Sequence, residues 1–125
     1  MEYRQKMAKS NTEIIYDEEE DILFLSKKGK KVKASIDIGD FIIDVSTDGF
    51  VIGIEILNAS KNLNLTERQL ASLQEASMAV TYKPNYVFIY LSMKLKEKEK
   101  DIAIPLTVDL GHGSARTDRA KFGVA

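Results

Sequence analysis

Hydrophobic and polar positions alternate at a period of two along two neighbouring segments, residues 41–47 and 50–57, and Asp48-Gly49 lies between them. Such alternation is typical of strands with one buried face. Asp-Gly is a favoured two-residue hairpin turn because both positions must tolerate positive φ. We therefore expect an antiparallel hairpin with a two-residue turn. Its apolar face would carry four cross-strand pairs: Thr47 with Phe50, Val45 with Ile52, Ile43 with Ile54, and Phe41 with Ile56.

The opposite face of this hairpin is mixed in character. It would carry three pairs: Ser46 with Val51, Asp44 with Gly53, and Ile42 with Glu55. Asp44 and Glu55 are then diagonal neighbours, near enough to share a cation or to perform general acid/base work. The alternative is two solvated carboxylates on an exposed sheet face, which is the usual place of acidic residues. A slip of one residue would move both acids into the core, so the register is strongly specified.

A first hairpin is expected upstream, from strands at residues 13–16 and 21–26 joined by an acidic turn. Both faces of the second strand are apolar, which is typical of a strand in the centre of a sheet. The acidic run, residues 17–21, could bind a metal or a basic partner, but it lacks the spaced oxygen ligands and the glycine of a calcium loop. A solvated turn is the simpler interpretation, because like charges repel and stay in water.

Five lysines follow within residues 27–33, around Gly29, and a short strand is expected at residues 34–38. Lysines can neutralise phosphates, but this run has no arginine and no interleaved aromatic residue on which a base would stack. A solvated loop is therefore favoured over a nucleic-acid contact.

One helix start is well marked. Thr66 as N-cap and Gln69 three residues later form a capping box, and Leu65 and Leu70 stand where a hydrophobic staple requires them. The pattern predicts a helix from Glu67 to about residue 76, with a narrow apolar stripe that packs on one sheet face.

Alternation returns in residues 78–82 and 86–95, with Pro84 in the turn between them. The expected pairs are Tyr82 with Val87, Val80 with Ile89, and Met78 with Leu91. A third strand is expected beyond a charged turn about Lys98-Glu99, with these pairs: Leu95 with Ile102, Met93 with Ile104, Leu91 with Leu106, and Ile89 with Val108. Pro105 lies on the opposite face of that strand, where its missing N–H favours an edge position or a bulge.

Tight turns between successive strands favour an α+β fold of antiparallel hairpins and a meander, with one short helix packed on the sheet. We expect a flexible arm at residues 1–12, a single domain at residues 13–110 and a flexible tail at residues 111–125, since the ends lack periodicity.

The composition narrows the classes of function. A chain of 125 residues suits one domain, and 18 basic against 19 acidic residues argue against a dedicated nucleic-acid or acidic-membrane binder. No apolar run is long enough to cross a bilayer, and the polar start does not resemble a signal peptide. With no cysteine there is no disulfide or thiol chemistry. A cytoplasmic location fits these features.

A tyrosine-aspartate acidic turn, an aliphatic strand, a glycine turn and the ending Gly-Ile-Glu-Ile-Leu-Asn-Ala-Ser lie within residues 14–61. Over this segment the chain resembles the small prokaryotic family named domain of unknown function 2283. The resemblance implies a compact β-rich module without an assigned activity. Some members are regarded as candidate antitoxins because of neighbouring genes. No catalytic or ligand residue is implied.

Most catalytic machinery is missing from the sequence. The single histidine, His112, lies between two glycines in the expected tail, where nothing holds its geometry. No nucleophile elbow, phosphate loop or zinc-ligand spacing occurs, so no cofactor or metal is expected. Four tyrosines could line a pocket, although aromatic residues at strand spacing are more often core residues: Tyr16, Tyr82, Tyr86 and Tyr90.

Two hypotheses of function remain, and the sequence leans away from an enzyme. The first is a non-catalytic interaction module that self-associates or neutralises a protein partner, because two β-units leave strand edges to cover. The second is a small hydrolase or ligand-binding domain that uses Asp44 and Glu55, and it predicts an adjoining cleft and a raised pKa for one carboxyl group. We favour the first.

Overall fold

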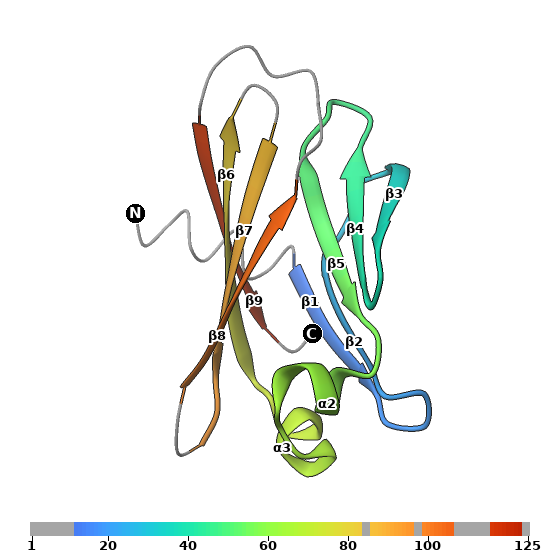
Figure 1. Ribbon diagram of the computed structural model, residues 1–125, viewed down its shortest axis with the longest axis vertical. Helices are drawn as coiled ribbons and strands as arrows, with labels where there is room; N and C mark the ends of the chain where they lie inside the picture. Colours follow the sequence, from blue (N-terminus) through green and yellow to red (C-terminus); the bar gives the residue numbers. More distant parts are fainter. Residues whose placement is uncertain (1–11, 84–85, 97–98, 107–115, 124–125) are drawn as a thin grey trace.

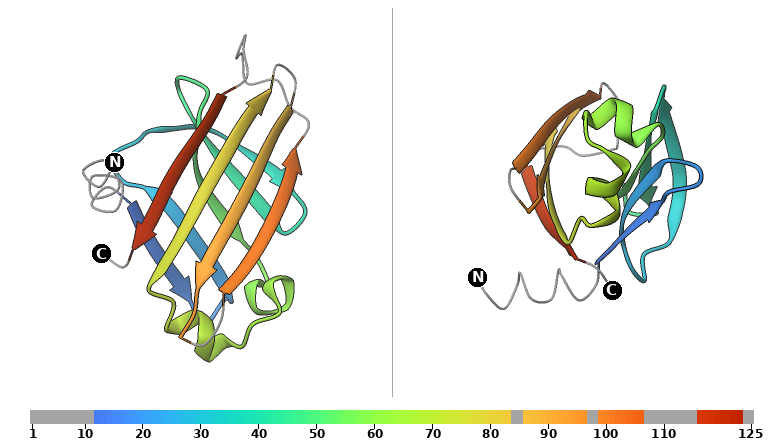
Figure 2. Two further views of the ribbon diagram at one scale, coloured as in Figure 1. Left: turned by 90° about the vertical axis from the view of Figure 1, so that its left-hand side faces the viewer. Right: turned by 90° about the horizontal axis from the view of Figure 1, so that it is seen from below.

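Two antiparallel sheets pack face to face in this protein (Figures 1 and 2). The computed structural model describes residues 12–83, 86–96, 99–106 and 116–123. The first sheet has the strand order β1-β2-β5-β4-β3 and the second the order β8-β7-β6-β9. The strands of the first sheet are β1 (Thr12–Asp17), β2 (Ile22–Lys27), β3 (Val32–Ile38), β4 (Phe41–Ser46) and β5 (Val51–Ile56). Those of the second are β6 (Glu75–Lys83), β7 (Tyr86–Lys94), β8 (Glu99–Leu106) and β9 (Arg116–Gly123).

Two short helices, α2 (Ala59–Leu63) and α3 (Glu67–Ala71), connect the sheets and cover one end of the sandwich (Figure 2). The chain therefore combines helices with antiparallel strands as expected, but strands dominate and the described residues form two helices where one was expected. Among the described residues, no helix is long and apolar enough to cross a membrane.

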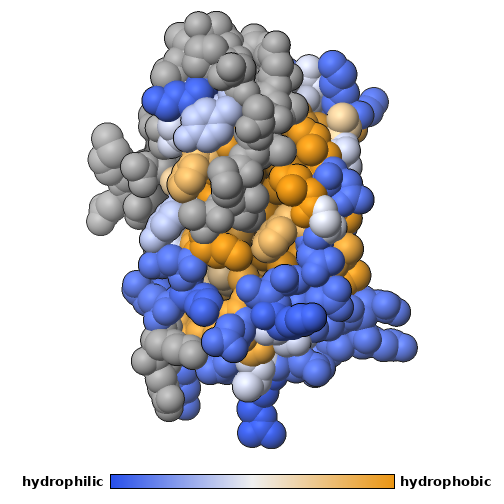
Figure 3. Space-filling model, in the orientation of Figure 1, coloured by the Kyte–Doolittle hydropathy of each residue, from blue (hydrophilic) through white to orange (hydrophobic). Residues whose placement is uncertain are grey.

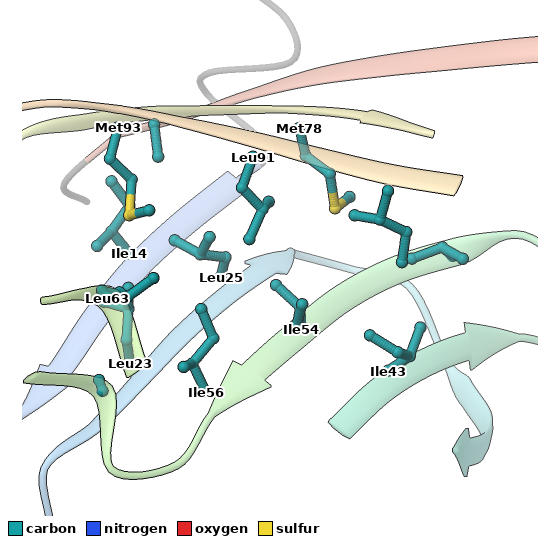
Figure 4. Packing of buried hydrophobic residues seen from close by; sticks show 14 of the residues in the cluster. Ile14, Leu23, Leu25, Ile43, Ile54, Ile56, Leu63, Met78, Leu91 and Met93 are labelled. Carbon is teal, nitrogen blue, oxygen red and sulfur yellow. The ribbon is translucent and has the colours of Figure 1, made fainter. Parts of the chain in front are cut away.

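The core lies between the sheets and takes alternate residues from nearly every strand. Leu23, Ile54 and Ile56 of the first sheet face Met78 and Leu91 of the second (Figure 4). All five are at most 1% exposed. Burial at every second residue is the period that the sequence displays, so the alternation assigns these faces correctly.

The central hairpin keeps most of its expected register but not its turn. Four predicted pairings are confirmed: Phe41 with Ile56, Ile42 with Glu55, Ile43 with Ile54, and Asp44 with Gly53. The predicted pairings nearer the turn are wrong. Ser46 donates its N–H to the carbonyl of Phe50 at 2.9 Å, and Gly49 with φ 84° closes a three-residue loop.

Val45 consequently pairs with Val51, not with Ile52. The ladder then shifts by one residue between Asp44 and Val45, so a β-bulge restores the expected register. A three-residue loop with glycine in the left-handed region is the next commonest hairpin loop after the two-residue turn, and Asp-Gly suits both.

The helix prediction is right at its start and wrong at its end. The Thr66 hydroxyl accepts a hydrogen bond from the Gln69 N–H at 3.0 Å, and the Gln69 side chain accepts from the Thr66 N–H at 2.9 Å, which confirms the capping box. Helix α3 ends at Ala71 because Ala76, expected on its stripe, already belongs to the alternating buried positions of β6. Ala76 fits both periods, so periodicity alone did not separate them.

Helix α2 was not predicted. It has five residues, only Ala59 and Leu63 of it are buried, and Asn58 and Asn64 at its two ends adopt left-handed φ values of 48° and 53°. Two buried residues four positions apart are too short a pattern to mark a helix.

The second sheet confirms the β6–β7 register, with Tyr82 opposite Val87 and Met78 opposite Leu91. The register predicted for β7 and β8 is wrong by four residues, because Leu91 pairs with Ile102 and Ile89 with Ile104. A shift of four leaves every side chain on its expected face, so alternation does not detect it. The observed register places Lys94 opposite Glu99. Pro105 lies in β8, which is an edge strand as expected.

The expected flexible arm and tail are described only in part, and the described part of the tail forms a strand. Residues 1–11 of the expected arm, Val108 of the predicted ladder and His112 lie outside the described residues. Within the expected tail, Arg116–Gly123 form β9, which pairs with β6 along its whole length. This strand has no hydrophobic alternation that would have marked it in the sequence.

The sandwich is closed on one side and open on the other. Strand β9 lies beside β1, which joins the two sheets along one side (Figure 2). On the opposite side the sheets end in β3 and β8, and neither has a second strand neighbour among the described residues. We call this the open side, and it faces the viewer in Figure 1.

Candidate functional site: two faces of the first sheet

The first sheet brings the candidate acids together as expected. Asp44 in β4 pairs with Gly53, and Glu55, two residues further along β5, pairs with Ile42. The two carboxylates are therefore diagonal neighbours on the face that points away from the core. Both are partly buried.

Glu55 lies in a partly apolar setting. Phe24 on β2 and Ile42 on β4 stand directly opposite it on either side. Burial raises the pKa of Glu55, and the nearby negative charge of Asp44 raises it further. Asp44 itself accepts a hydrogen bond of 2.8 Å from the Ser35 hydroxyl. Glu55 can thus hold a proton more readily than an isolated carboxylate.

Gly53 is required for this arrangement. A Cβ atom built at this position would lie 2.9 Å from the carbonyl oxygen of Leu25 and 3.4 Å from a carboxylate oxygen of Asp44. Real Cβ atoms do not approach a backbone oxygen so closely. The glycine therefore lets β2 and the Asp44 side chain approach this point of β5.

Further catalytic groups do not gather around the acids. Among the described residues, no three histidine or acidic side chains are arranged to hold a metal ion. The four candidate tyrosines do not share one place. Tyr82 is fully buried, and its hydroxyl accepts a hydrogen bond from the Val51 N–H. The Tyr16 hydroxyl donates a hydrogen bond to Asp21, whereas Tyr90 is 41% exposed on β7.

A polar cluster at the helical end was missed by sequence reasoning. Asp21, with φ 56°, accepts hydrogen bonds from the Tyr16 hydroxyl at 2.6 Å and from the Ser60 hydroxyl at 2.7 Å. Its carboxylate also accepts from the Ser60 N–H at 3.1 Å, and its carbonyl accepts from the Ala59 N–H at 2.9 Å. The end of the acidic turn therefore caps the first turn of α2. We call the side chains of Asp21, Tyr16 and Ser60 the Asp21 clamp.

Burial and the hydrogen bonds of the Asp21 clamp shift the pKa of Asp21 and that of Tyr16. Burial alone would raise the pKa of Asp21, but the hydrogen bonds from Tyr16 and Ser60 outweigh it and hold this pKa below its ordinary value. Burial, followed by the bond to Asp21, raises the pKa of Tyr16. In the sequence, Tyr16 stands five residues before Asp21, and Ser60 lies far from both. Only the fold brings these three side chains together.

The acidic run and the lysine run lie in the loops beside the first sheet. Glu18, Glu19 and Glu20 are exposed at the tip between β1 and β2, and the lysine run is largely exposed between β2 and β3. One ion pair of 3.8 Å joins Lys28 to Glu13. These observations fit the solvated turn and loop favoured from sequence.

The open side presents hydrophobic surface. Val32 at the start of β3 is 49% exposed, and Ile36 and Ile38 of the same strand are only partly buried. Phe50 and Ile102 are likewise partly buried at the rim of the core. Figure 3 shows hydrophobic residues gathered along this side, between β8 and the β4–β5 hairpin. The outer edge of β3, the edge away from β4, borders this surface.

Comparison with known proteins confirms the resemblance seen in the sequence. Residues 13–60 match the family described as a protein of unknown function, DUF2283. The chain is 47% identical over 57 residues to an uncharacterized protein of Methanocaldococcus jannaschii, which is 46% of this chain and 49% of that protein. It is 36% identical over 63 residues, 50% of this chain and 51% of the relative, to a Methanosarcina mazei protein named "Putative hypoxanthine phosphoribosyltransferase". The chain thus spans about half the length of these curated relatives, and no solved structure matches it.

The matched segment corresponds to a definite part of the fold. Residues 13–60 run from β1 to the first turn of α2, so they comprise the first sheet and the complete Asp21 clamp. Gly53 and both candidate acids also lie within it. The second sheet lies outside the matched segment.

Proposed function

We propose that this protein is a non-catalytic protein-interaction module that binds another polypeptide along its open side. The observation that carries the proposal is that β3 and β8 each have one edge without a strand neighbour among the described residues, beside partly exposed apolar residues. An unpaired strand offers a row of backbone donors and acceptors to another chain, and exposed apolar side chains add to the gain on pairing.

Photo-crosslinking from the open side tests this proposal. A photoreactive amino acid replaces Val32, and a control carries it at Ile15, which is equally exposed at 47% but lies on the outer face of β1. Adducts identified by mass spectrometry should form from position 32 and not from position 15. The captured polypeptide, once purified, should bind Val32→Glu more weakly than Ile15→Glu. Adducts from neither position, or only from position 15, contradict the proposal.

A second candidate function has one observation in its favour. The raised pKa of Glu55 beside Asp44 is what a ligand-binding or hydrolytic carboxylate pair would display. Its test is a panel of ester, glycoside and phosphate substrates assayed with the wild-type chain and with the Asp44→Asn/Glu55→Gln double variant. Turnover that is present in the wild type and absent in the variant supports an enzyme. Equal rates for both chains reject it.

A further inference from the structure

The edge strand β3 has a sequence that is complementary to itself when it is read in the antiparallel direction. Its seven residues are Val-Lys-Ala-Ser-Ile-Asp-Ile. A two-fold axis through Ser35 sets Ala34 opposite Ile36 and Lys33 opposite Asp37, whereas Val32 lies beyond the bulge in β3. Each of these pairs then joins residues of matching chemistry.

We propose that the partner at the open side is a second copy of this chain, which pairs β3 with β3 in this register and extends the first sheet through the two-fold axis. The inference rests on the proposed function and names its partner and surface. Pairing in this way would convert two five-stranded sheets into one continuous ten-stranded sheet.

Charge supports this register over its neighbours. Lys33 and Asp37 are both exposed, and no ion pair joins either of them to another residue in the described part of the chain. A lysine on an edge strand normally prevents pairing, because two copies bring charge into the interface without a partner. In this register each lysine meets the partner's aspartate, and symmetry forms the pair twice. A shift of two residues in one direction would place Asp37 opposite Ser35 and Lys33 opposite Gly39. A shift in the other direction would place Lys33 opposite Ser35 and Lys31 opposite Asp37, so Lys33 has no acid opposite it in either shifted register.

Burial supports pairing along this edge of β3. Ala34, Ile36 and Ile38 pair with Val45, Ile43 and Phe41 of β4, which places them on the core side of the sheet. Even so, Ala34 is exposed and the two isoleucines are only partly buried, because no described strand lies on the other side of β3. An axis through a residue keeps the apolar faces of both copies on the same side, so each copy covers the apolar edge of the other.

The bulge in β3 limits the strength of association. The register with β4 shifts between Val32 and Ala34, which places Lys33 at the irregularity. The pairs nearest the axis, Ala34 with Ile36 and Ser35 with Ser35, lie in the regular part of the strand. One strand pair is a small interface, so we expect reversible self-association rather than a permanent dimer.

A charge exchange tests the register. Sedimentation equilibrium from about 5 µM to about 1 mM compares the wild type with Lys33→Asp, Asp37→Lys, the double variant and the control Lys31→Asp, at an exposed lysine outside the pairing. Each single variant sets like charges opposite each other twice and should weaken self-association on the order of tenfold. The double variant should recover the wild-type value, and the control should not change it.

A disulfide tests the axis independently of charge. The chain has no cysteine, so Ser35→Cys carries a single thiol that would meet its own copy across the axis. Directly opposed strand residues lie within the Cα separation that a disulfide spans. Under mild oxidation, Ser35→Cys should form a covalent dimer faster than Thr47→Cys, an exposed residue in the β4–β5 loop.

The outcomes separate this inference from the proposed function. A wild-type chain that stays monomeric at about 1 mM, while position 32 still crosslinks to a different polypeptide, overturns the self-pairing and leaves the interaction module standing. A wild-type dimer without rescue in the double variant, or without faster disulfide formation at position 35, overturns the register. Absence of both adducts and dimer overturns both proposals.

Discussion

The Tyr82 hydroxyl accepts a hydrogen bond of 2.8 Å from the backbone N–H of Val51, which ties β6 of the second sheet to β5 of the first. The Tyr82 ring packs edge-to-face against Phe50, with centroids 5.6 Å apart. Tyr82 is fully buried. This tyrosine therefore fastens the two sheets at the end of the sandwich that holds the β4–β5 loop.

Replacement of Tyr82 by phenylalanine tests this link. The variant keeps the ring but leaves the buried Val51 N–H without its acceptor, and such a group costs about 1–3 kcal/mol. Urea denaturation should show that loss in the free energy of unfolding. Tyr90→Phe serves as the control, because the bond that it removes, to Asp101, lies at the exposed surface of β7, and it should lower the denaturation midpoint less. Equal effects of the two substitutions would contradict the structure.

The Asp21 clamp predicts a second loss of stability. Asp21→Asn keeps the size of the side chain and tolerates the left-handed backbone, but it removes the charge that accepts three hydrogen bonds. We expect a loss of about 2–3 kcal/mol at pH 7, since bonds to charged groups are the stronger ones. Glu19→Gln, in the exposed part of the same turn, should have little effect.

The effect of Asp21→Asn should depend on pH in a definite direction. Because the folded pKa of Asp21 lies below its ordinary value, its contribution is complete above the unfolded pKa of about 3.9 and is lost as the pH falls through the folded pKa. The difference in unfolding free energy between wild type and variant should thus be constant from pH 7 to 5 and shrink on further acidification. A difference that grew with acid would refute the clamp.

Glu55 should behave in the opposite way. Its folded pKa is raised, so folding favours its protonated form, and stability is lost as the pH rises from the unfolded pKa through the folded one. Glu55→Gln should therefore raise the thermal midpoint at pH 7 and give no such gain at pH 3. Carbon-detected NMR titration should also find that Asp44→Asn lowers the pKa of Glu55, because it removes the neighbouring charge. An unchanged Glu55 pKa would show that the two carboxyl groups do not interact.

Glycines 53 and 39 should respond differently to substitution. Gly53→Ala forces a Cβ against the Leu25 carbonyl and should cost about 1–3 kcal/mol, and Gly53→Asn should cost more. Gly39 has a φ of 64° and open space around it, so its constraint is the backbone conformation alone. Gly39→Asn should therefore be milder than Gly39→Ala, since asparagine tolerates this region. Chemical denaturation of the four variants gives the comparison, and the same order at both positions would contradict it.

The local pattern of residues predicted much of the fold. Alternation assigned the faces of β4 to β7, and the capping box located the start of α3. It failed where two structures share one pattern. Ala76 fits a helical stripe and a strand equally well. Asp48-Gly49 is compatible with a two-residue and with a three-residue hairpin loop. The charged turn before β8 allows registers that are four residues apart. Periodicity carries no information that separates these cases, and packing decides them.

The candidate site was predictable only in part. The neighbourhood of Asp44 and Glu55 followed from one hairpin register, which the bulge at Val45 happens to preserve. The Asp21 clamp was not predictable, because it joins residues 39 positions apart. The open side depended on the order of the strands in the two sheets. That order arises from long-range pairing such as that of β2 with β5, which no local pattern encodes.

Amide hydrogen exchange at two protein concentrations tests whether β3 pairs with β3 of a second copy. In the separate chain, the β3 amides that point away from β4 have no strand partner among the described residues and should exchange rapidly. Exchange in residues 32–38 should slow as the concentration rises, while the other edge strand, β8, should keep the same rate. Identical exchange of β3 at both concentrations, or slowing confined to β8, would contradict this pairing.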